Sequence, residues 1–362
     1  MSAVPYVFYD DGRYLKGLDG LRAFSVLLVI VGHFGFDKKV PGGLGVTIFF
    51  FLSGFLITTL LRGEQMAVGQ IQLGNFYIRR FLRLTPELYA FLLITIVAGR
   101  SYGIDSPPPQ IAAAFAFFTN YLSIAQASFA VSPHWPQLWS LAVEEHFYLT
   151  FPLLLVVCRN HPTRLLALLG LVCIFGPIWR LTAHLDGALD LYTSKASECR
   201  IDSMAWGCLM SIVFERFGYA LRAAPRAATG GLVLAGILML VSLVYRDQTF
   251  RETFRFSLQG LSLGLGFWGL FFCPLGMTLR NLLELSPIRW MGRRSYGAYL
   301  WNTELHHLFS NLSGGPASDL PIPQRAIVAA LAVLVTFILA EISYRLFLKP
   351  LSGLRQRFEL KA

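Results

Sequence analysis

Long apolar stretches separated by short polar segments recur along the whole chain. An α-helix needs about 20 residues to cross the roughly 30 Å hydrocarbon core of a bilayer, and most of these stretches approach that length. Pro, Gly and Arg gather between them, as expected where helices end. The pattern predicts an all-α, polytopic integral membrane bundle of about ten transmembrane helices, at residues 21–36, 43–61, 81–99, 144–158, 164–183, 201–217, 228–245, 257–274, 295–311 and 325–345.

One further stretch, residues 110–127, is apolar but interrupted by Thr119, Asn120 and Tyr121. We interpret it as an interfacial or re-entrant segment, with an eleventh span as the alternative. The first apolar run lacks a small-residue cleavage site, so it is expected to remain as helix one rather than to be removed as a signal peptide. No separate soluble domain is visible, so residues 1–362 are expected to form a single transmembrane domain that acts alone.

Lys and Arg are concentrated in alternate connecting segments. With a cytoplasmic N-terminus, the segments on the cytoplasmic side hold 21 of the 31 basic residues, as the positive-inside rule requires. The longest stretch without a Lys or Arg, residues 101–158, contains the large outer loop of this arrangement. Both termini are therefore predicted to be cytoplasmic, which agrees with an even number of spans.

Composition supports the membrane assignment, since 55% of the residues are hydrophobic and only 14% are charged, against about a quarter in soluble domains. The net charge of +10 does not indicate nucleic-acid binding, because the basic residues lie at loop ends where the positive-inside rule explains them. The five cysteines lie within or beside apolar runs without metal-ligand spacing, and are expected to act as small core hydrophobes. No H-E-x-x-H motif is present, so no metal site is expected.

The first apolar run, LDGLRAFSVLLVIVGHFGF (18–36), has Arg22 at its mouth and His33 deep inside. Eleven residues make about three helical turns, so both side chains are predicted on one face about 16 Å apart. An ionisable group inside a bundle costs about 2.5 to 3.5 kcal/mol on insertion scales, which makes it a functional candidate. The alternatives are a hydrogen bond from His33 to a neighbouring helix and a snorkelling anchor role for Arg22.

Two further clusters lie in the second and third predicted helices. Ser53 follows three phenylalanines, and a hydrogen-bonding role is favoured over a nucleophilic one because no G-x-S-x-G motif is present. Arg79, Arg80 and Arg83 stand at the predicted start of the third helix, where their charge opposes the helix dipole. They are either positive-inside anchors or a site for a phosphate-bearing anion, which would relieve that opposition.

The segment HWPQLWSLAVEEHFYL (134–149) places Glu144, Glu145 and His146 at the predicted start of the fourth helix, just after Trp139 and Ser140. A helix start tolerates carboxylates, so one of the two is either part of an N-terminal cap or, with the imidazole and the indole, part of an acceptor pocket. In ECRIDSMAWG (198–207), Glu198, Arg200 and Asp202 are expected to form mutual salt bridges. Gly260 and Gly264 form a small-xxx-small pair that predicts close helix packing.

The order of these motifs resembles the membrane-bound acyltransferase 3 family over essentially the whole chain. The resemblance rests on Arg22 and His33 with ten residues between them, followed by FFFLSG, RRFLRLTP, WSLAVEEHFYL, RIDSMAWG, SYGAYLW and AEISYRLFLKP. It implies a multi-pass protein of the bacterial inner membrane that acylates sugars or glycoconjugates with acyl groups from coenzyme A, acetyl-CoA being the expected donor.

Carried over onto this chain, the family's arginine–histidine pair falls on Arg22 and His33, and the basic motif on Arg79, Arg80 and Arg83. Its WSL-x-V-E motif falls on Trp139, Ser140, Leu141, Val143 and Glu144. The chain departs from the family at three positions. His146 stands where glutamine is frequent, Asn302 follows SYGAYLW where histidine is usual, and Leu348 replaces the usual glutamate before x-Pro.

The mechanism implied has acyl-CoA phosphates on Arg79, Arg80 and Arg83, and neutral His33 as the general base for an acceptor hydroxyl. Glu144 orients either His33 or the sugar, and the expected substrate-binding residues are Ser53, Trp139, Ser140 and Asp202. Two other classes stay open. One is a transporter or exporter of a sugar-linked or lipid-linked substrate, and the other is a non-catalytic subunit of a polysaccharide assembly complex. The resemblance assigns neither the acceptor nor the oligomeric state.

Overall fold

The computed structural model describes residues 15–37, 39–101, 103–127, 134–159 and 161–358. Within these ranges every regular element is a helix, so the all-α prediction is confirmed. The predicted cytoplasmic ends of the chain, residues 1–14 and 359–362, lie outside the described residues.

Each predicted span falls on a long helix, with ends that differ by several residues. These helices are α1 (Leu18–Val31, followed by the π-helical turn η1, Gly32–Phe36), α2 (Gly42–Val68), α3 (Leu73–Ser101), α6 (Leu138–Val157), α7 (Pro162–Leu185), α9 (Ser197–Arg222), α10 (Pro225–Val244), α12 (Arg255–Phe272), α15 (Ser295–Ser313) and α16 (Ile322–Ser343).

Seven helices of the described chain are long and apolar enough to cross a membrane: α1 with η1, α2, α3, α6, α7, α10 and α16 with η3 (Tyr344–Leu348). An eighth span is counted if α12 is joined to α13 (Pro274–Leu283), from which it is bent by 94°. α9 and α15 are long enough but are not among the helices that qualify by apolarity, and α9 carries Glu198, Arg200 and Asp202. The chain is thus a multi-pass membrane protein, while apolarity alone does not establish ten spans.

The interrupted segment at 110–127 forms two short helices, α4 (Pro108–Phe115) and α5 (Thr119–Ala127). They are separated at Phe117, whose φ of 58° is incompatible with a continuing right-handed helix. At 1.5 Å per residue each helix is only about 12 to 14 Å long. An eleventh span is therefore excluded. Other short helices occupy segments predicted as loops: α8 (Asp190–Lys195), α11 (Gln248–Glu252), α13, α14 (Ser286–Arg293), η2 (Ala317–Asp319) and α17 (Ser352–Gln356).

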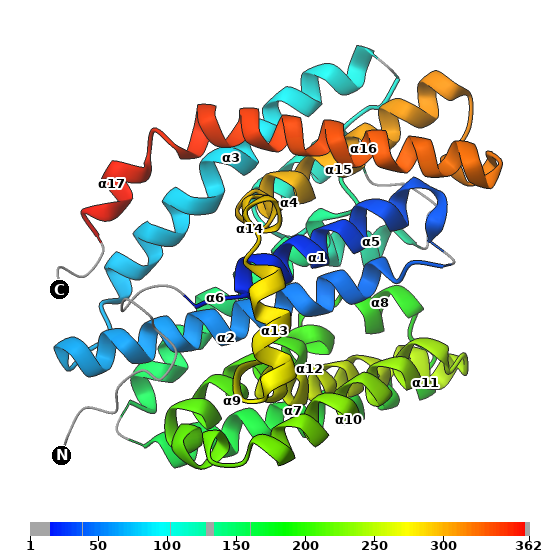
Figure 1. Ribbon diagram of the computed structural model, residues 1–362. Helices are drawn as coiled ribbons and strands as arrows, with labels where there is room; N and C mark the ends of the chain where they lie inside the picture. The colour runs from blue at the N-terminus through cyan, green and yellow to red at the C-terminus, as the bar shows by residue number, and fades with distance from the viewer. Residues whose placement is uncertain (1–14, 38, 102, 128–133, 160, 359–362) are drawn as a thin grey trace. The chain divides into compact units, whose positions relative to one another are not determined.

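The chain divides into two compact units. Unit 1 contains the described residues of 1–21, 47–71 and 143–289, and unit 2 those of 22–46, 72–142 and 290–362. In unit 1, α7, α9, α10 and α12 run side by side, coloured green to yellow in Figure 1. In unit 2, α15 packs on α16 and contacts α3. The single-domain prediction for the whole chain stays a prediction.

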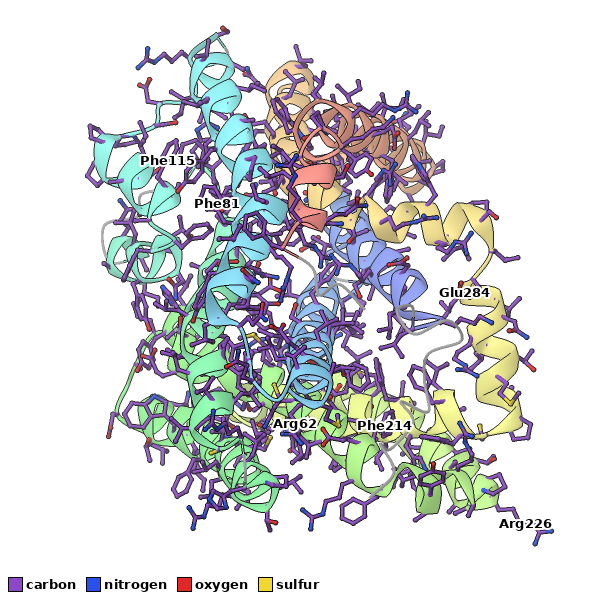
Figure 2. All side chains as sticks on the ribbon, turned by 90° about the vertical axis from the view of Figure 1, so that its left-hand side faces the viewer. Arg62, Phe81, Phe115, Phe214, Arg226 and Glu284 are labelled. Atoms are coloured by element: carbon purple, nitrogen blue, oxygen red, sulfur yellow. The ribbon has the colours of Figure 1, made fainter. Side chains whose placement is uncertain are left out.

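Close helix packing in unit 1 depends on small residues. A Cβ at Gly260 would overlap the indole of Trp206 on α9, which confirms the packing predicted for this glycine. Likewise, a Cβ at Gly54 on α2 would overlap the carbonyl group of Met204 on α9. The packed core also contains all five cysteines, which are buried and free, as predicted. Figure 2 labels Phe214 of α9, whose ring contacts those of Phe271 and Phe272 edge-on.

Candidate active site

His33 lies at a break in the first predicted span, in unit 2. The α-helix ends at Val31, and in η1 Phe34 (φ −93°, ψ 48°) and Gly35 (φ 87°) leave helical geometry. Gly35 is required there, because L side chains rarely adopt this φ and a Cβ would lie 2.9 Å from the backbone of Ala317. The span predicted over 21–36 is present, as Leu18–Phe36, and its helix breaks directly after His33. The imidazole is exposed at the point where the helix breaks.

Asn302 of α15 contacts this imidazole, with 2.6 Å between His33 Nδ1 and Asn302 Oδ1. The amide orientation follows from its other side, because Asn302 Nδ2 donates to the carbonyl oxygens of Tyr299 (2.6 Å) and Ala298 (3.3 Å). Since Oδ1 can only accept, Nδ1 of His33 carries the proton. In a neutral ring Nε2 then keeps its lone pair, which is the form that a general base needs.

Arg22 contacts the same face of α15 as His33 does. Its Nε donates to Ser295 Oγ at 3.2 Å. Ser295 and Asn302 are seven residues apart, about two helical turns, so they share one face of α15. Arg22 and His33 therefore contact α15 in the same order as their sequence numbers, which makes the two helices locally parallel. Arg22 and His33 are aligned through α15 rather than through a contact between themselves.

The three arginines of RRFLRLTP lie in unit 2, within α3. This helix begins at Leu73, six residues before Arg79, and therefore the prediction that the arginines stand at a helix N-terminus was wrong. The helix dipole acts mainly within the first turn, so it does not oppose the charges of these arginines. The dipole therefore gives no argument for a bound anion at this place. Arg79 Nη1 donates to the carbonyl oxygen of Phe358 at 2.6 Å, while Arg83 is exposed.

Trp139 and Ser140, also in unit 2, lie in the first turn of α6. Ser140 Oγ is 2.6 Å from the hydroxyl of Tyr299, which itself donates to the carbonyl oxygen of Gln137 at 3.0 Å. Ser140 is buried and Trp139 is half-buried. The hydroxyl of Ser140 thus joins α6 to the part of α15 that precedes Asn302.

Glu144 and Ser53 meet in unit 1. Ser53 Oγ donates a hydrogen bond to Glu144 Oε1, which also accepts from the hydroxyl of Tyr148 at 2.7 Å. The hydrogen-bonding interpretation of Ser53 is confirmed. Because α6 begins at Leu138, Glu144 lies almost two turns inside the helix, so the alternative of an N-terminal cap is wrong.

Asp202, in unit 1, is paired with Arg180 of α7. Arg180 donates from Nη1 to Asp202 Oδ1 at 3.0 Å and from Nη2 to Oδ2 at 2.8 Å, and both side chains are 0% exposed. Ser257 Oγ donates to the same carboxylate at 2.7 Å, and Arg180 Nε donates to the carbonyl oxygen of Thr253 at 2.7 Å. Asp202 does form a salt bridge, but to a residue of another helix that the local sequence pattern did not identify.

Asn302 is the site residue that sequence reasoning treated only as a departure from the family. The sequence feature that could have identified Asn302 is its spacing, because it is a polar residue seven positions after Ser295. The residues that the structure describes contain no group of three or more His, Cys, Asp or Glu side chains placed to hold a metal ion.

Comparison with known proteins connects this chain to bacterial cell-wall enzymes. It is 29% identical over 360 residues to the peptidoglycan O-acetyltransferase OatA of Listeria monocytogenes, covering 94% of this chain and 56% of the relative. It is also 29% identical to the putative peptidoglycan O-acetyltransferase YrhL of Bacillus subtilis (94% and 55%) and to the O-acetyltransferase OatA of Staphylococcus aureus (94% and 57%). The chain thus spans just over half the length of these curated relatives. No solved structure matches it.

A family model described as "Acyltransferase domain" matches residues 15–341. This range includes α1 to α15 and nearly all of α16, so it covers most of both units and every candidate residue described above. Since the match covers most of the 362 residues, the chain belongs to the acyltransferase 3 family.

Proposed function

We propose that the protein is a membrane-embedded O-acyltransferase that moves an acyl group, expected to be acetyl, from acyl-CoA to a hydroxyl of a glycan. Family membership supports acyl transfer, and the names of the relatives support an acetyl group and an acceptor of the peptidoglycan type. The observation that carries the proposal is the bond between His33 and Asn302, which leaves Nε2 of His33 with a lone pair.

In the proposed reaction Nε2 of His33 takes the proton of an acceptor hydroxyl as its oxygen attacks the thioester carbonyl. The new ester C–O bond forms, the C–S bond breaks, and the proton passes from the imidazolium to the leaving thiolate. General-base help of this kind is typically worth about 10² to 10⁴ in rate. Asn302 holds the ring and accepts from Nδ1–H, which stabilises the imidazolium that forms during the attack. Arg22 fixes α1 against α15 two turns away from Asn302.

For the donor we propose a phosphate site made by Arg79, Arg80 and Arg83. Arg79 and Arg83 are four residues apart, and Arg80 and Arg83 three, so the three guanidinium groups gather on one side of α3. Planar guanidinium groups bind phosphates by two parallel charge-assisted hydrogen bonds, which suits the diphosphate of coenzyme A. The carbonyl of Phe358 holds one nitrogen of Arg79 and would orient its guanidinium.

For the acceptor we propose a contribution from Trp139 and Ser140 of unit 2, where Trp139 offers a half-buried indole for stacking on a sugar ring. In unit 1, Glu144 accepts hydrogen bonds from the hydroxyls of Ser53 and Tyr148, and the substrate-binding role expected for Ser53 and Glu144 stays a prediction. Asp202 was expected to bind substrate directly, which would require it to release Arg180. Because the pair is completely buried, we propose instead that Asp202 supports unit 1 through its packing.

The topology proposed with this function has ten spans and both termini in the cytoplasm. The parallel contacts of α1 and α15 support it, because the first and ninth spans of an alternating chain cross the membrane in the same direction. The proposed count adds α9, α12 and α15 to the seven helices that qualify by apolarity.

The test uses purified protein in detergent with acetyl-CoA and soluble peptidoglycan fragments. Free CoA is measured as thiol and acetylated glycan by mass spectrometry, for wild type and His33→Ala. We expect release that requires both the glycan and His33. Binding is measured separately, because a ligand of the native state raises the melting temperature. A protein that neither turns over nor is stabilised by acetyl-CoA contradicts the donor assignment, and transport without acyl transfer would favour the exporter alternative.

A further inference from the structure

A second histidine of unit 2, His134, is held between a hydroxyl and a carboxylate. Ser106 Oγ lies 2.6 Å from His134 Nδ1, and Glu304 Oε1 lies 3.2 Å from His134 Nε2. Ser106 precedes α4, His134 precedes α6, and Glu304 lies on α15, so three separate segments meet at one imidazole. None of these residues was identified from sequence as a site residue.

The imidazole of His134 is held in place by several further contacts. It stacks on Trp135 with ring centroids 4.5 Å apart, and its backbone N–H donates to Gln110 Oε1 at 3.1 Å. A Cβ at Gly99 of α3 would lie 2.9 Å from its Cε1 atom, so only glycine leaves room for the ring. The side chain of His134 is 0% exposed and that of Glu304 is 9% exposed, whereas Ser106 is half-buried.

The carboxylate of Glu304 sets the tautomer of His134. An ionised carboxylate can only accept, so Nε2 carries a proton and Nδ1 of the neutral ring has the lone pair. That lone pair faces the hydroxyl of Ser106. The connectivity is that of a serine–histidine–acid triad with the two ring nitrogens interchanged, and such triads are recognised by geometry and roles rather than by sequence order.

This constellation is distinct from the His33 site. Glu304 follows Asn302 by two residues, which places the two side chains about 200° apart around α15. The contacts agree, because Asn302 meets His33 of η1 whereas Glu304 meets His134 ahead of α6. α15 therefore carries one histidine-orienting residue on each of two nearly opposite faces.

We propose that Ser106, His134 and Glu304 form a second nucleophilic site, which receives an acyl group from an activated acyl ester or thioester and passes it to a hydroxyl. Ser106 Oγ attacks the acyl carbonyl, its proton moves to His134 Nδ1, and the bond to the leaving group breaks as that proton is returned to it. In the second step the acceptor hydroxyl loses its proton to Nδ1, attacks the ester of Ser106, and Oγ regains the proton. The inference rests on the proposed function only for the source of the acyl group.

The experiment uses the full-length protein in detergent and a fluorophosphonate reagent, which labels activated serines without acetyl-CoA or a glycan. Labelled peptides are identified by mass spectrometry, and 4-nitrophenyl acetate serves as an activated ester to trap acetyl-Ser106. We expect modification at Ser106, lost in Ser106→Ala. Ser123→Ala is the matched control, because Ser123 lies in neighbouring α5 and its hydroxyl donates to the backbone of Thr119.

The role of the carboxylate is tested with Glu304→Gln, which keeps an oxygen to accept from His134 but removes the charge. We expect the labelling rate of Ser106 to fall by about 10²-fold or more, because the amide no longer stabilises the imidazolium that forms when His134 takes the proton of Ser106. If this variant loses its thermal transition, Gly99→Ala displaces the imidazole instead, with Gly74→Ala as control because a Cβ at Gly74 has no neighbour within 4 Å.

Absence of label on Ser106 in folded wild type overturns the proposal, and so does a labelling rate unchanged by these variants. Because the reagent needs neither donor nor glycan, such a failure leaves the His33 proposal standing. Conversely, labelled Ser106 in a protein that does not use acetyl-CoA would refute the donor assignment alone.

Discussion

The contact of His33 with Asn302 in unit 2 and the pair of Arg180 with Asp202 in unit 1 are both polar contacts inside apolar sequence, yet they are built differently. Arg180 donates to Asp202 in bidentate fashion and the pair is completely buried. His33 lies at a helix break, exposed, with one ring nitrogen fixed and the lone pair of the other available.

The cost of inserting an ionisable group makes both places functional candidates from sequence. The structure distinguishes them by whether the hydrogen-bonding capacity is used up within the protein. A saturated ion pair has nothing left to offer a substrate and acts in packing, whereas an oriented imidazole at a break in a helix is available for proton transfer. The comparison can be tested by asking which of the two contacts controls activity and which controls stability.

The largest effect on activity is expected for His33→Ala. Removing the base should lower the rate of acetyl transfer by about 10² to 10⁴-fold at saturating acetyl-CoA. The melting temperature should change little, because the side chain is exposed. Turnover is followed by release of CoA thiol. Wild-type turnover in this variant would remove His33 from the mechanism and leave only a packing role for η1.

The opposite behaviour is expected for Asp202→Ala. Leaving the buried Arg180 without its carboxylate should cost about 3 to 5 kcal/mol of stability. The thermal transition in detergent should move to clearly lower temperature, while activity per folded molecule at low temperature stays near wild type. Arg180→Met combined with Asp202→Leu should recover much of the loss, since apolar replacements avoid an unpaired buried charge. A stable Asp202→Ala protein without activity would make this pair part of the site.

A smaller effect on activity is expected for Asn302→Ala. Losing a hydrogen bond to the charged imidazolium costs about 1.5 to 3 kcal/mol, or about 10 to 10²-fold in turnover, with the KM for acetyl-CoA unchanged. Asn302→Asp keeps an acceptor for Nδ1–H and should retain more activity than Asn302→Ala. Equal loss in both variants would indicate that Asn302 supports only the packing of α15.

The helical class and the approximate position of each long helix could be predicted, because hydropathy determines which residues can lie in the membrane. Helix ends could not. α3 begins at Leu73 and α6 at Leu138, each six or more residues before the predicted start. The residues that lengthen α3 include polar side chains such as Arg79, which extend a helix without making it apolar, and the residues that lengthen α6 include Ser140. The break at Gly35 was missed for the converse reason, since its apolar neighbours hide a backbone change.

The candidate site was predicted in part. His33 and Ser53 were chosen correctly as polar groups making specific contacts, but their partners Asn302 and Glu144 are 269 and 91 residues away in sequence. A local pattern of apolar and polar residues carries no information about contacts between residues so far apart in sequence. The pairing of Asp202 with Arg180 was overlooked for the same reason. Only Arg200, which is near Asp202 in sequence, was considered as the basic partner of Asp202. The spacing of Ser295 and Asn302 was the one local signal available.

The smallest effect is expected for the arginines of α3, and it tests whether they bind the phosphates of acetyl-CoA or only anchor the helix at the membrane surface. Arg80→Gln with Arg83→Gln should raise the KM for acetyl-CoA by about tenfold, which corresponds to about 1.4 kcal/mol of lost binding free energy, and should leave kcat nearly unchanged. The matched control is Arg226→Gln. Arg226 is an exposed arginine near the start of α10, labelled in Figure 2, and it belongs to no proposed site. Initial rates at varied acetyl-CoA give both constants. Equal effects in the two variants would mean that the arginines of α3 are anchors too, and the donor would then have to be bound by other residues.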